Sequence, residues 1–374
     1  MTENPFLFDR PLPADQLVDR ASELETLIGL ARSGQSARIA APRRFGKTTL
    51  LGALADLAWN AHEMVPAYVD LSGVTTLDDV AARVRGAYER GLDRGKLRAA
   101  WRSIRRRGAS AQVGVPGMAT ATAGIGQAPT SRAMAELHDA LDLPRRVHER
   151  TDRRCLVIFD EFQDLLTASD DLDGLLRSHL QHHVGIASYV FAGSQPSLMR
   201  SLFGDRRRPL FEQARAIELG PLPLPELASW IDERLASAGR EPLGEHVDAL
   251  VELVAGHPQR AMLLAHFLFE QPDGPDTLEA ATTAALREAD DGLQQTWRAL
   301  TAAQRRLLGA VANGHHRILS GAALAYTGDP KSTQVAVRDQ LVDEAHLRIR
   351  SDGSAELVDP FLGLWLRQRQ RATS

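Results

Sequence analysis

The sequence predicts an α/β fold in three parts: a three-layer αβα parallel sheet, a group of helices, and a C-terminal winged helix. Strands and helices alternate over the first part of the chain, which is the pattern of a doubly wound parallel sheet. After the proline-rich stretch PLPLP at 221–225, the apolar spacing becomes helical. The last part follows the order helix, short helix, longer helix, hairpin, which is typical of a winged helix-turn-helix domain.

The sheet-forming part contains short apolar runs separated by amphipathic segments. Uninterrupted apolar runs are expected for strands that are buried on both faces. We predict strands at 37–40, 66–71, 156–159, 186–192 and 217–219. We predict helices at 14–33, 48–61, 77–90, 131–150 and 172–182. These elements define a first domain at 1–220.

The rest of the chain divides into a small helical lid at 221–296 and a winged helix at 297–374. The lid is expected to contain helices at 226–238, 244–255, 258–269 and 277–290. The winged helix is expected to contain helices at 304–312, 320–326 and 332–344, and a hairpin of 347–350 with 356–359. Its longer helix carries Asp339 and Asp343, which make a poor surface for DNA. A winged helix that serves packing or protein contact is the alternative.

The stretch 38–51, RIAAPRRFGKTTLL, has the form of a P-loop, or Walker A motif, between a strand and a helix. Gly46 lets the backbone approach phosphates, Lys47 places a charge on the β and γ phosphates, and Thr48 offers a hydroxyl to Mg²⁺. Ala41 stands where the consensus has glycine, and it is small enough to fit. The loop residues expected to contact a nucleotide are Pro42, Arg43, Arg44, Phe45, Gly46, Lys47, Thr48 and Thr49.

A second motif supports the first. The stretch 154–166, RCLVIFDEFQDLL, is an apolar run that ends in two carboxylates. Asp160 is expected to emerge at the carboxyl end of its strand, where ligands of open α/β sheets bind. There it can hold Mg²⁺ together with Thr48, while Glu161 can polarise the attacking water. The two motifs together predict an ATP site with Mg²⁺ as its metal.

Composition places the chain among ordinary globular proteins. Its 374 residues are 44% hydrophobic and 25% charged, with a formal net charge of −4, so no overall basicity points to nucleic acid. The single cysteine, Cys155, excludes an internal disulfide framework. The pairs His182-His183 and His315-His316 are adjacent in sequence and so do not share a helix face, which argues against a metal role. No signal-peptide pattern or membrane-spanning apolar run is present, so a cytoplasmic location without a membrane partner is expected.

Two neighbouring segments have unusual composition. The span 94–107 carries seven basic residues and no acidic one. A helix there either contacts phosphates or presents a solvated face. The segment 108–126, GASAQVGVPGMATATAGIG, alternates with a period of two, so a hairpin of thin strands, an exposed loop and disorder all stay open.

A set of short stretches resembles the archaeal-type ATPases of the AAA+/STAND group of P-loop proteins, which are related to origin-recognition ATPases. The stretches are Val18-Asp19-Arg20 with Glu23-Leu24, APRRFGKTTLL, VIFDEFQDL, FAGSQPSLMRSLF, RRPLF with Arg215, Gly256-His257-Pro258 and VDPFLGLWLR. The resemblance covers nearly the whole chain. Many families share the phosphate and acidic motifs, whereas RRFGKTTLL, the Gly-Ser-Gln strand end and the VDPFLGLWLR tail are more particular.

The resemblance implies roles that the residues alone do not. Val18, Asp19 and Arg20 are expected near the adenine. Ser194 matches the polar sensor position, which responds to the γ-phosphate. Pro258 belongs to a turn that resembles the lid motif of STAND switches, in which a lid residue contacts the nucleotide.

Arginines are implied at two further positions of the resembling family. Arg260 is close to where AAA+ proteins carry a second sensor arginine. A finger arginine that acts on the nucleotide of a neighbouring subunit is expected at Arg206–Arg208, with Arg207 as the candidate, or at Arg215. This finger implies self-association.

Together these observations predict an ATP-binding and ATP-hydrolysing switch in which the nucleotide state is coupled to the lid and the winged helix. ATP and ADP are its expected ligands, and double-stranded DNA or a protein is the expected partner of the winged helix. One alternative is a nucleotide-locked regulator with negligible turnover. Another is a DNA-binding regulator that uses the winged helix and the basic segment 94–107.

Overall fold

The computed structural model describes residues 3–13, 16–93, 97–100, 102–104, 129–241, 243–272 and 274–373. Its centre is a parallel five-stranded sheet with the order β2-β3-β4-β1-β5. The strands are β1 (Ala37–Ala40), β2 (Val65–Asp70), β3 (Cys155–Asp160), β4 (Ala187–Gly193) and β5 (Arg215–Ile217). All neighbouring strands pair in parallel. This confirms the predicted three-layer α/β fold.

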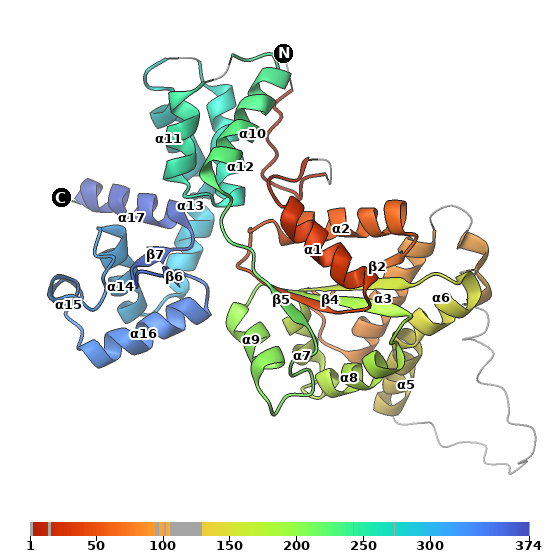
Figure 1. Cartoon of the computed structure of the whole chain (residues 1–374). Coiled ribbons are helices and arrows are strands. Elements are labelled where there is room, and N and C mark those ends of the chain that lie inside the picture. Colours follow the sequence, from red (N-terminus) through yellow and green to blue (C-terminus); the bar gives the residue numbers. More distant parts are fainter. Residues whose placement is uncertain are drawn as a thin grey trace, which may run out of the picture.

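Helices cover both faces of the sheet because side chains of a strand alternate between faces. Leu156 and Ile158 of β3 pack against α1 (Ala21–Arg32) and α2 (Lys47–His62). Val157 and Phe159 of the same strand face the opposite layer. That layer consists of α3 (Leu77–Leu92), α5 (Pro129–Leu141), α6 (Leu143–Thr151), α7 (Leu165–Ala168), α8 (Leu172–His182) and α9 (Pro196–Gly204). Figure 1 shows the two layers on either side of the strands.

Several expected elements of the sheet-forming part differ from the observed ones. The helix expected at 131–150 is two helices, α5 and α6, because Pro144 lacks the amide hydrogen that a continuous helix would need there; it lies instead in the first turn of α6. The helix expected from 14 begins at Ala21, since the backbone of Asp19 has a positive φ of 35°. The last strand ends at Ile217, two residues before the expected end.

The helices after the sheet are α10 (Leu224–Ser237), α11 (Glu245–Leu253), α12 (Pro258–Glu270) and α13 (Thr277–Ala299). The helix α13 has 23 residues and extends well beyond the expected end at 290. The N-terminal segment 3–13 also packs here. Phe6 is fully buried beside Trp230 and Phe269, and its carbonyl oxygen lies 2.9 Å from Nδ1 of His266.

The chain ends in α14 (Ala302–Ala312), α15 (Gly321–Thr327), α16 (Lys331–Asp343), the antiparallel hairpin β6 (Leu347–Ile349) and β7 (Ala355–Leu357), and α17 (Pro360–Thr373). One apolar cluster joins α10–α13 to this C-terminal part, from Leu227 through Leu293 to Trp365. Figure 1 shows α13 and α17 meeting where these two parts adjoin. The division of the chain at 220 and 296, and the winged-helix assignment, remain predictions.

The unusual segments lie largely outside the described residues. Of the basic span 94–107, residues 98–100 and 102–104 are helical, and the segment 108–126 falls outside the description. Within the described ranges, no helix is both long enough and apolar enough to span a membrane.

Candidate nucleotide-binding site

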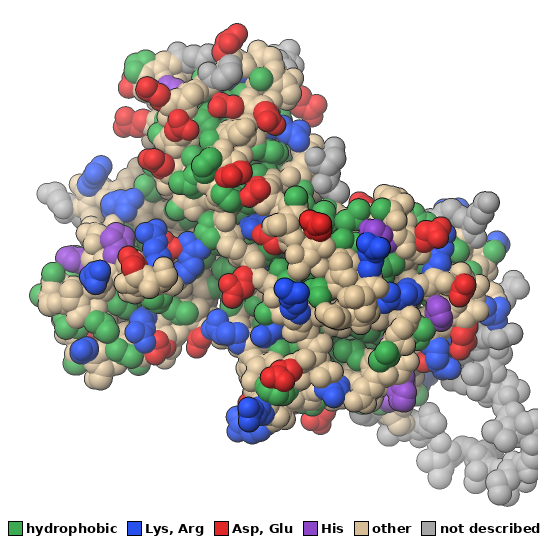
Figure 2. Space-filling view, viewed as in Figure 1, with side chains coloured by type: hydrophobic (Ala, Val, Ile, Leu, Met, Phe, Trp, Pro, Cys, Tyr) green, Lys and Arg blue, Asp and Glu red, His purple; other side chains and the backbone are tan. Residues whose placement is uncertain are grey.

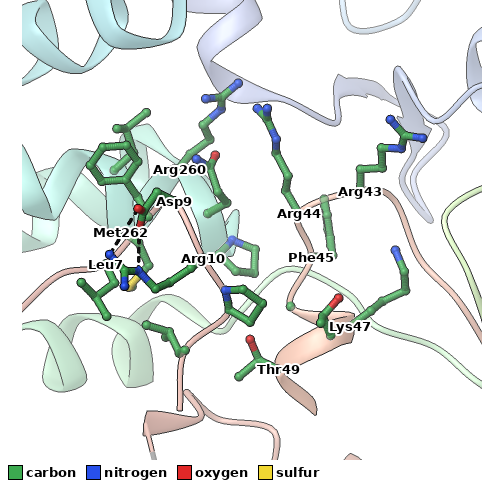
Figure 3. Close-up of a pocket in the computed structure, with 18 of the residues that line it drawn as sticks. Leu7, Asp9, Arg10, Arg43, Arg44, Phe45, Lys47, Thr49, Arg260 and Met262 are labelled. Atoms are coloured by element: carbon green, nitrogen blue, oxygen red, sulfur yellow. Dashed lines mark hydrogen bonds and ion pairs between the residues drawn. The ribbon is translucent and has the colours of Figure 1, made fainter. Parts of the chain in front are cut away.

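A pocket of about 920 Å³ lies at the carboxyl ends of the strands, between the sheet and helices α12 and α13. The loop and the first turn of α2, Arg43–Thr49, form its floor. The residues that contribute from α12 and α13 are Pro258, Gln259, Arg260, Met262, Leu263, Glu288, Ala289 and Gly292. The segment Leu7–Leu12 completes the wall. Figure 3 shows Asp9 and Arg10 of this segment beside Met262, opposite Lys47 and Thr49 of the loop. Ligand sites of open α/β sheets occur in this position.

The loop 41–46 wraps around the amino group of Lys47. Gly46 has a φ of 80° and is the N-cap of α2, so the first turn of this helix faces the pocket. Nζ of Lys47 donates to the carbonyl oxygens of Ala41 (2.8 Å) and Pro42 (3.1 Å). The lysine is 5% exposed, and burial lowers its pKa, partly opposed by Glu161 and Asp160. A buried ammonium held only by neutral carbonyls gains strongly from a phosphate.

Ala41, the departure from the P-loop consensus, is fully buried. Its amide donates to the carbonyl oxygen of Gly193 at 3.3 Å, which continues the pairing of β1 with β4. The methyl group is part of the apolar cluster beneath the loop. Alanine is therefore accommodated here, and the loop keeps its form.

The two expected metal ligands lie together. Oγ1 of Thr48, at the start of α2, donates to Oδ2 of Asp160 at 3.4 Å. The hydroxyl of Tyr68 donates to the same oxygen at 2.5 Å. Burial raises the pKa of Asp160 above its usual value, against the opposing effect of Tyr68. A hydroxyl and a carboxylate oxygen are ligands that Mg²⁺ prefers, so the residues fit the ion.

Tyr68 is a site residue that was not predicted from the sequence. It lies in β2, whose residues pair in register with β3 as far as Asp70 and Asp160. The signal was present in the stretch PAYVDL, where one polar-tipped side chain interrupts an apolar strand. Its proximity to Asp160 depends on the order of the strands, which local patterns do not specify.

Glu161 is engaged by its neighbours. Its Oε2 accepts hydrogen bonds from Oγ of Ser194 (2.5 Å), from the Ser194 amide (3.3 Å) and from Nε2 of Gln163 (2.6 Å). Burial alone raises the pKa of Glu161, but these bonds and the charge of Lys47 lower it overall. The structure therefore brings together Glu161 and Ser194, the expected water-polarising and sensor residues, and adds Gln163 to them.

The entry to α1 also reaches the pocket. Val18 and Arg20 line it, whereas Asp19 does not. The Arg20 guanidinium is 6% exposed, donates to the carbonyl oxygen of Gly220 at 2.5 Å and pairs with Glu23 at 2.8 Å. Arg20 therefore joins the start of α1 to the connection that leads into α10.

The turn at 256–258 forms the opposite wall. Gly256 has a φ of 69°, and a Cβ there would lie 2.1 Å from the carbonyl oxygen of Leu222, so only glycine fits. The ring of His257 packs edge to face against Phe45 of the loop, with centroids 4.9 Å apart. Its Nδ1 accepts a hydrogen bond from the Arg260 amide at 3.3 Å. Pro258 lines the pocket, and its role as a lid residue stays a prediction.

Arg260 lines the pocket but its guanidinium is bound elsewhere. It forms a two-point ion pair with Asp359, at 2.9 and 2.5 Å, and lies 4.9 Å from the centre of the Phe361 ring. Figure 3 shows the side chains of Arg44 and Arg260 extending alongside one another. Burial, followed by the charge of Arg260, lowers the pKa of Arg44. This part of the pocket therefore has an excess of positive charge, which suits an anion.

The candidate finger arginines lie away from the pocket lining. The side chain of Arg207, just after α9, is 90% exposed and pairs with Asp205 at 2.8 Å. Arg208 pairs with Asp173 at 3.3 Å. Arg206 and Arg215 are exposed and, like these two, are absent from the residues that form the pocket wall. Within one chain none of them reaches the loop, so the finger role stays a prediction for an assembly.

Comparison with known proteins identifies the fold. No protein-family model and no curated protein sequence matches the chain. Among solved structures it is similar to the Walker-type ATPase PABY2304 of Pyrococcus abyssi, with 16% identity, a TM-score of 0.67, and coverage of 96% of this chain and 99% of that one. It is also similar to the Aeropyrum pernix ORC2 protein in its ADPNP–ADP complexes (16% identity, TM-score 0.60, 98% of both chains) and its ADP form (17% identity, TM-score 0.54, 98% and 97%). The chain therefore has the fold of these archaeal ATPase and ORC structures, as the resemblance predicted.

Proposed function

We propose that the protein binds ATP with Mg²⁺ and hydrolyses it, as a P-loop switch of the AAA+ type. The observation that carries the proposal is the juxtaposition of Lys47, Thr48 and Asp160 at one end of a pocket of about 920 Å³. The names of the similar structures support it, because one is a Walker-type ATPase and another was solved with ADPNP and ADP. Phosphoryl transfer to water requires mainly charge placement and positioning from the protein.

Each residue has a defined task in this proposal. Lys47 exchanges its two carbonyl partners for phosphate oxygens. Thr48 and Asp160 hold Mg²⁺, which supplies charge stabilisation on the transferring phosphoryl group. Tyr68 keeps the Asp160 carboxylate in position through its hydrogen bond.

Glu161 is the proposed base that orients water. Its free oxygen, Oε1, is the available acceptor, because the described contacts to Ser194 and Gln163 all use Oε2. The proposed sensor role of Ser194 rests on the same contact. Its hydroxyl can donate either to Glu161 or to a γ-phosphate, so the loss of the γ-phosphate would change the hydrogen bond to Glu161. The alternative, a nucleotide-locked regulator, is supported by the three hydrogen bonds that Glu161 accepts, because they restrain the side chain that would orient water.

The helices beyond the sheet are the proposed moving parts. We assign 221–296 as a lid and 297–374 as a winged helix, and we propose that Arg260 reports the nucleotide state to the C-terminal part through Asp359. Arg260 lines the pocket and its guanidinium pairs with Asp359, so a single side chain joins the pocket wall to the C-terminal part. If Arg260 contacts the nucleotide more favourably in one conformation of the protein than in another, nucleotide binding shifts the population toward that conformation.

Duplex DNA binding is a second candidate, supported by the order of α14, α15, α16 and the β6–β7 hairpin. Two contacts of α16 oppose it. Arg338 pairs with Asp339, and Asp343 accepts hydrogen bonds from Ser197 and Arg200 of α9, so part of this helix faces the sheet domain. Figure 2 shows acidic side chains over α10–α12 and basic ones around the C-terminal helices, without one continuous basic face in this view. A protein partner for this part is the other possibility.

Two measurements test the proposal. Calorimetric titration of the full chain with ATP should give saturable binding, and phosphate release should require Mg²⁺ and stop with EDTA. The ATPase proposal fails if ATP neither binds nor is hydrolysed; binding without release in a single turnover favours the locked regulator. Fluorescence anisotropy with a labelled duplex tests the second candidate, because specific phosphate contacts predict an affinity that falls steeply with salt.

A further inference from the structure

Two helices on the side of the sheet opposite α1 and α2 bring together three histidines and an aspartate. His138 lies in the last turn of α5 and Asp142, four residues on, directly follows that helix. His179 lies in the last turn of α8 and His183, four residues on, is its C-cap. Residues at i and i+4 share one face of a helix. Each helix therefore presents a pair of ligand-type side chains, and Figure 1 shows α5 and α8 next to each other.

Three of the four side chains are close enough to share one ion, and His138 contacts one of these three. One donor atom each of Asp142, His179 and His183 lie within 4.8 Å of one another. Nδ1 of His138 lies 3.1 Å from Nε2 of His179. A tetrahedral ion with bonds of about 2.0–2.1 Å needs donor atoms about 3.4 Å apart, so binding requires the side chains to rotate, including that of His138, which lies outside the group of three.

His183 has a buried ring nitrogen without a hydrogen-bond partner among the described residues. Its side chain is 1% exposed, and Nδ1 lies 2.5 Å from the Tyr189 hydroxyl. The nitrogen without a partner in the described part of the chain is Nε2. A buried ring nitrogen is costly to leave unsatisfied. If Nδ1 donates to Tyr189, then Nε2 carries a free lone pair, and the Tyr189 contact orients the ring as metal-binding histidines usually require.

The surrounding charges are compatible with a cation. Arg145 binds both oxygens of the Asp142 carboxylate, with its Nε donating to Oδ1 at 2.9 Å and its Nη2 to Oδ2, and Arg146 lies 3.6 Å from Oδ2. Two carboxylate oxygens offer about four acceptor positions, so Asp142 can bind an ion and keep Arg145 as an orienting partner.

We propose that His138, Asp142, His179 and His183 form a binding site for a divalent transition metal, with Zn²⁺ as the ion of best fit. Three imidazoles and a carboxylate are borderline donors that suit Zn²⁺, Co²⁺ and Ni²⁺ better than Mg²⁺. The site is separate from the P-loop, because it lies near the amino ends of β3 and β4, whereas the pocket lies at the carboxyl ends. Its role is structural: it links α5 to α8.

The adjacent pairs His182-His183 and His315-His316 do not share a helix face, which argued against a metal role. The informative spacing was four residues, from His179 to His183 and from His138 to Asp142. Each pair alone is common in helices. Only the packing of α5 against α8 brings the pairs to one point.

Metal binding is tested on the full chain without a polyhistidine tag, stripped with EDTA and free of nucleotide. Titration with Co²⁺ should give one saturable equivalent with the absorption of a tetrahedral site, and Zn²⁺ should displace it and raise the melting temperature. His179→Gln and Asp142→Asn should each weaken Co²⁺ binding at least about tenfold. The matched control, His182→Gln, changes an exposed histidine of the same helix and should bind as the wild type does.

Three outcomes overturn the proposal: no saturable Co²⁺ binding at micromolar metal, unchanged binding in the His179→Gln variant, or an equal loss in the His182→Gln control. Far-ultraviolet circular dichroism confirms that each variant is folded. Because the readout is metal binding, the result does not depend on ATP hydrolysis.

Discussion

Arg260 and Asp359 form a two-point ion pair that joins the wall of the pocket to the start of α17. The Arg260 side chain is 4% exposed and that of Asp359 is 30% exposed. Asp359 also accepts a hydrogen bond from the Phe361 amide at 3.0 Å and thereby holds the first turn of α17. One carboxylate therefore fixes both the arginine beside the proposed nucleotide and the beginning of the last helix.

Replacing Asp359 should destabilise the protein, and the size of the loss measures the contribution of the ion pair with Arg260. Asp359→Asn leaves the buried guanidinium of Arg260 without its counter-charge, which should lower the free energy of unfolding by about 3 kcal/mol. Chemical denaturation measures the loss. A double-mutant cycle with Arg260→Gln should give a coupling energy above about 1 kcal/mol; purely additive losses would show that the pair does not link the two parts.

Removing the loop lysine should abolish tight nucleotide binding. Lys47→Ala deletes a charged partner of the phosphates, which is worth about 1.5–3 kcal/mol, or roughly a 10- to 150-fold weaker affinity for ATP. Calorimetry measures the change. Lys331→Ala, at the exposed start of α16, is the matched control and should bind ATP normally. Wild-type affinity in Lys47→Ala would place the nucleotide elsewhere.

Substituting the proposed base should separate binding from turnover. Glu161→Gln keeps the size of the side chain but removes its charge, so ATP affinity should persist while phosphate release falls at least about 100-fold. Single-turnover hydrolysis with Mg²⁺ is the measurement. Asp170→Asn, an exposed carboxylate before α8, serves as the control. Full turnover in Glu161→Gln would exclude this residue as the base.

His257 should make the protein less stable in mild acid. Burial lowers its pKa from 6.5 to about 4, so the unfolded chain binds this proton at a higher pH than the folded chain does. Stability linked to His257 is therefore complete above pH 6.5 and declines as pH falls towards 4. The contribution of His257 to the free energy of unfolding falls by about 2 kcal/mol between pH 6.5 and 5.

Comparison with His257→Gln isolates this contribution. The variant loses the contact with Phe45 and should be less stable at pH 7, yet its free energy of unfolding should fall less steeply between pH 7 and 5. Denaturation at several pH values measures both. His182→Gln, at an exposed position, is the control and should keep the wild-type dependence of the free energy of unfolding on pH. If His257→Gln also kept it, the buried ring of His257 would not be its cause.

A finger arginine predicts complementation between subunits. Arg207→Ala retains the loop and Lys47→Ala retains Arg207, so each variant alone should hydrolyse little ATP. If Arg207 acts on a neighbour, mixing them should restore activity above the sum of the two. Phosphate release across mixing ratios provides the test. Activity of Arg207→Ala that matches the wild type would remove this arginine from the mechanism.

Much of the fold was predictable because its signals are local. The strand at 37–40 and the helix at 172–182 have the expected bounds, since an apolar run and an amphipathic period are set by neighbours in the chain. The phosphate loop could also be predicted from the sequence, because its glycine, lysine and threonine are consecutive. The helix boundary at Pro144 also has a local cause, and attention to that proline would have found it.

The sequence by itself determined the alternating elements, the P-loop and the acidic strand end, because each depends on residues within one turn or one strand. Only the tertiary structure decided that residues 7–12 line the pocket, that Ser194 holds Glu161, that Asp359 binds Arg260, and that Asp142, His179 and His183 come together between α5 and α8. These contacts join distant segments. They depend on strand order and helix packing, which the whole chain sets through burial and which no short stretch specifies.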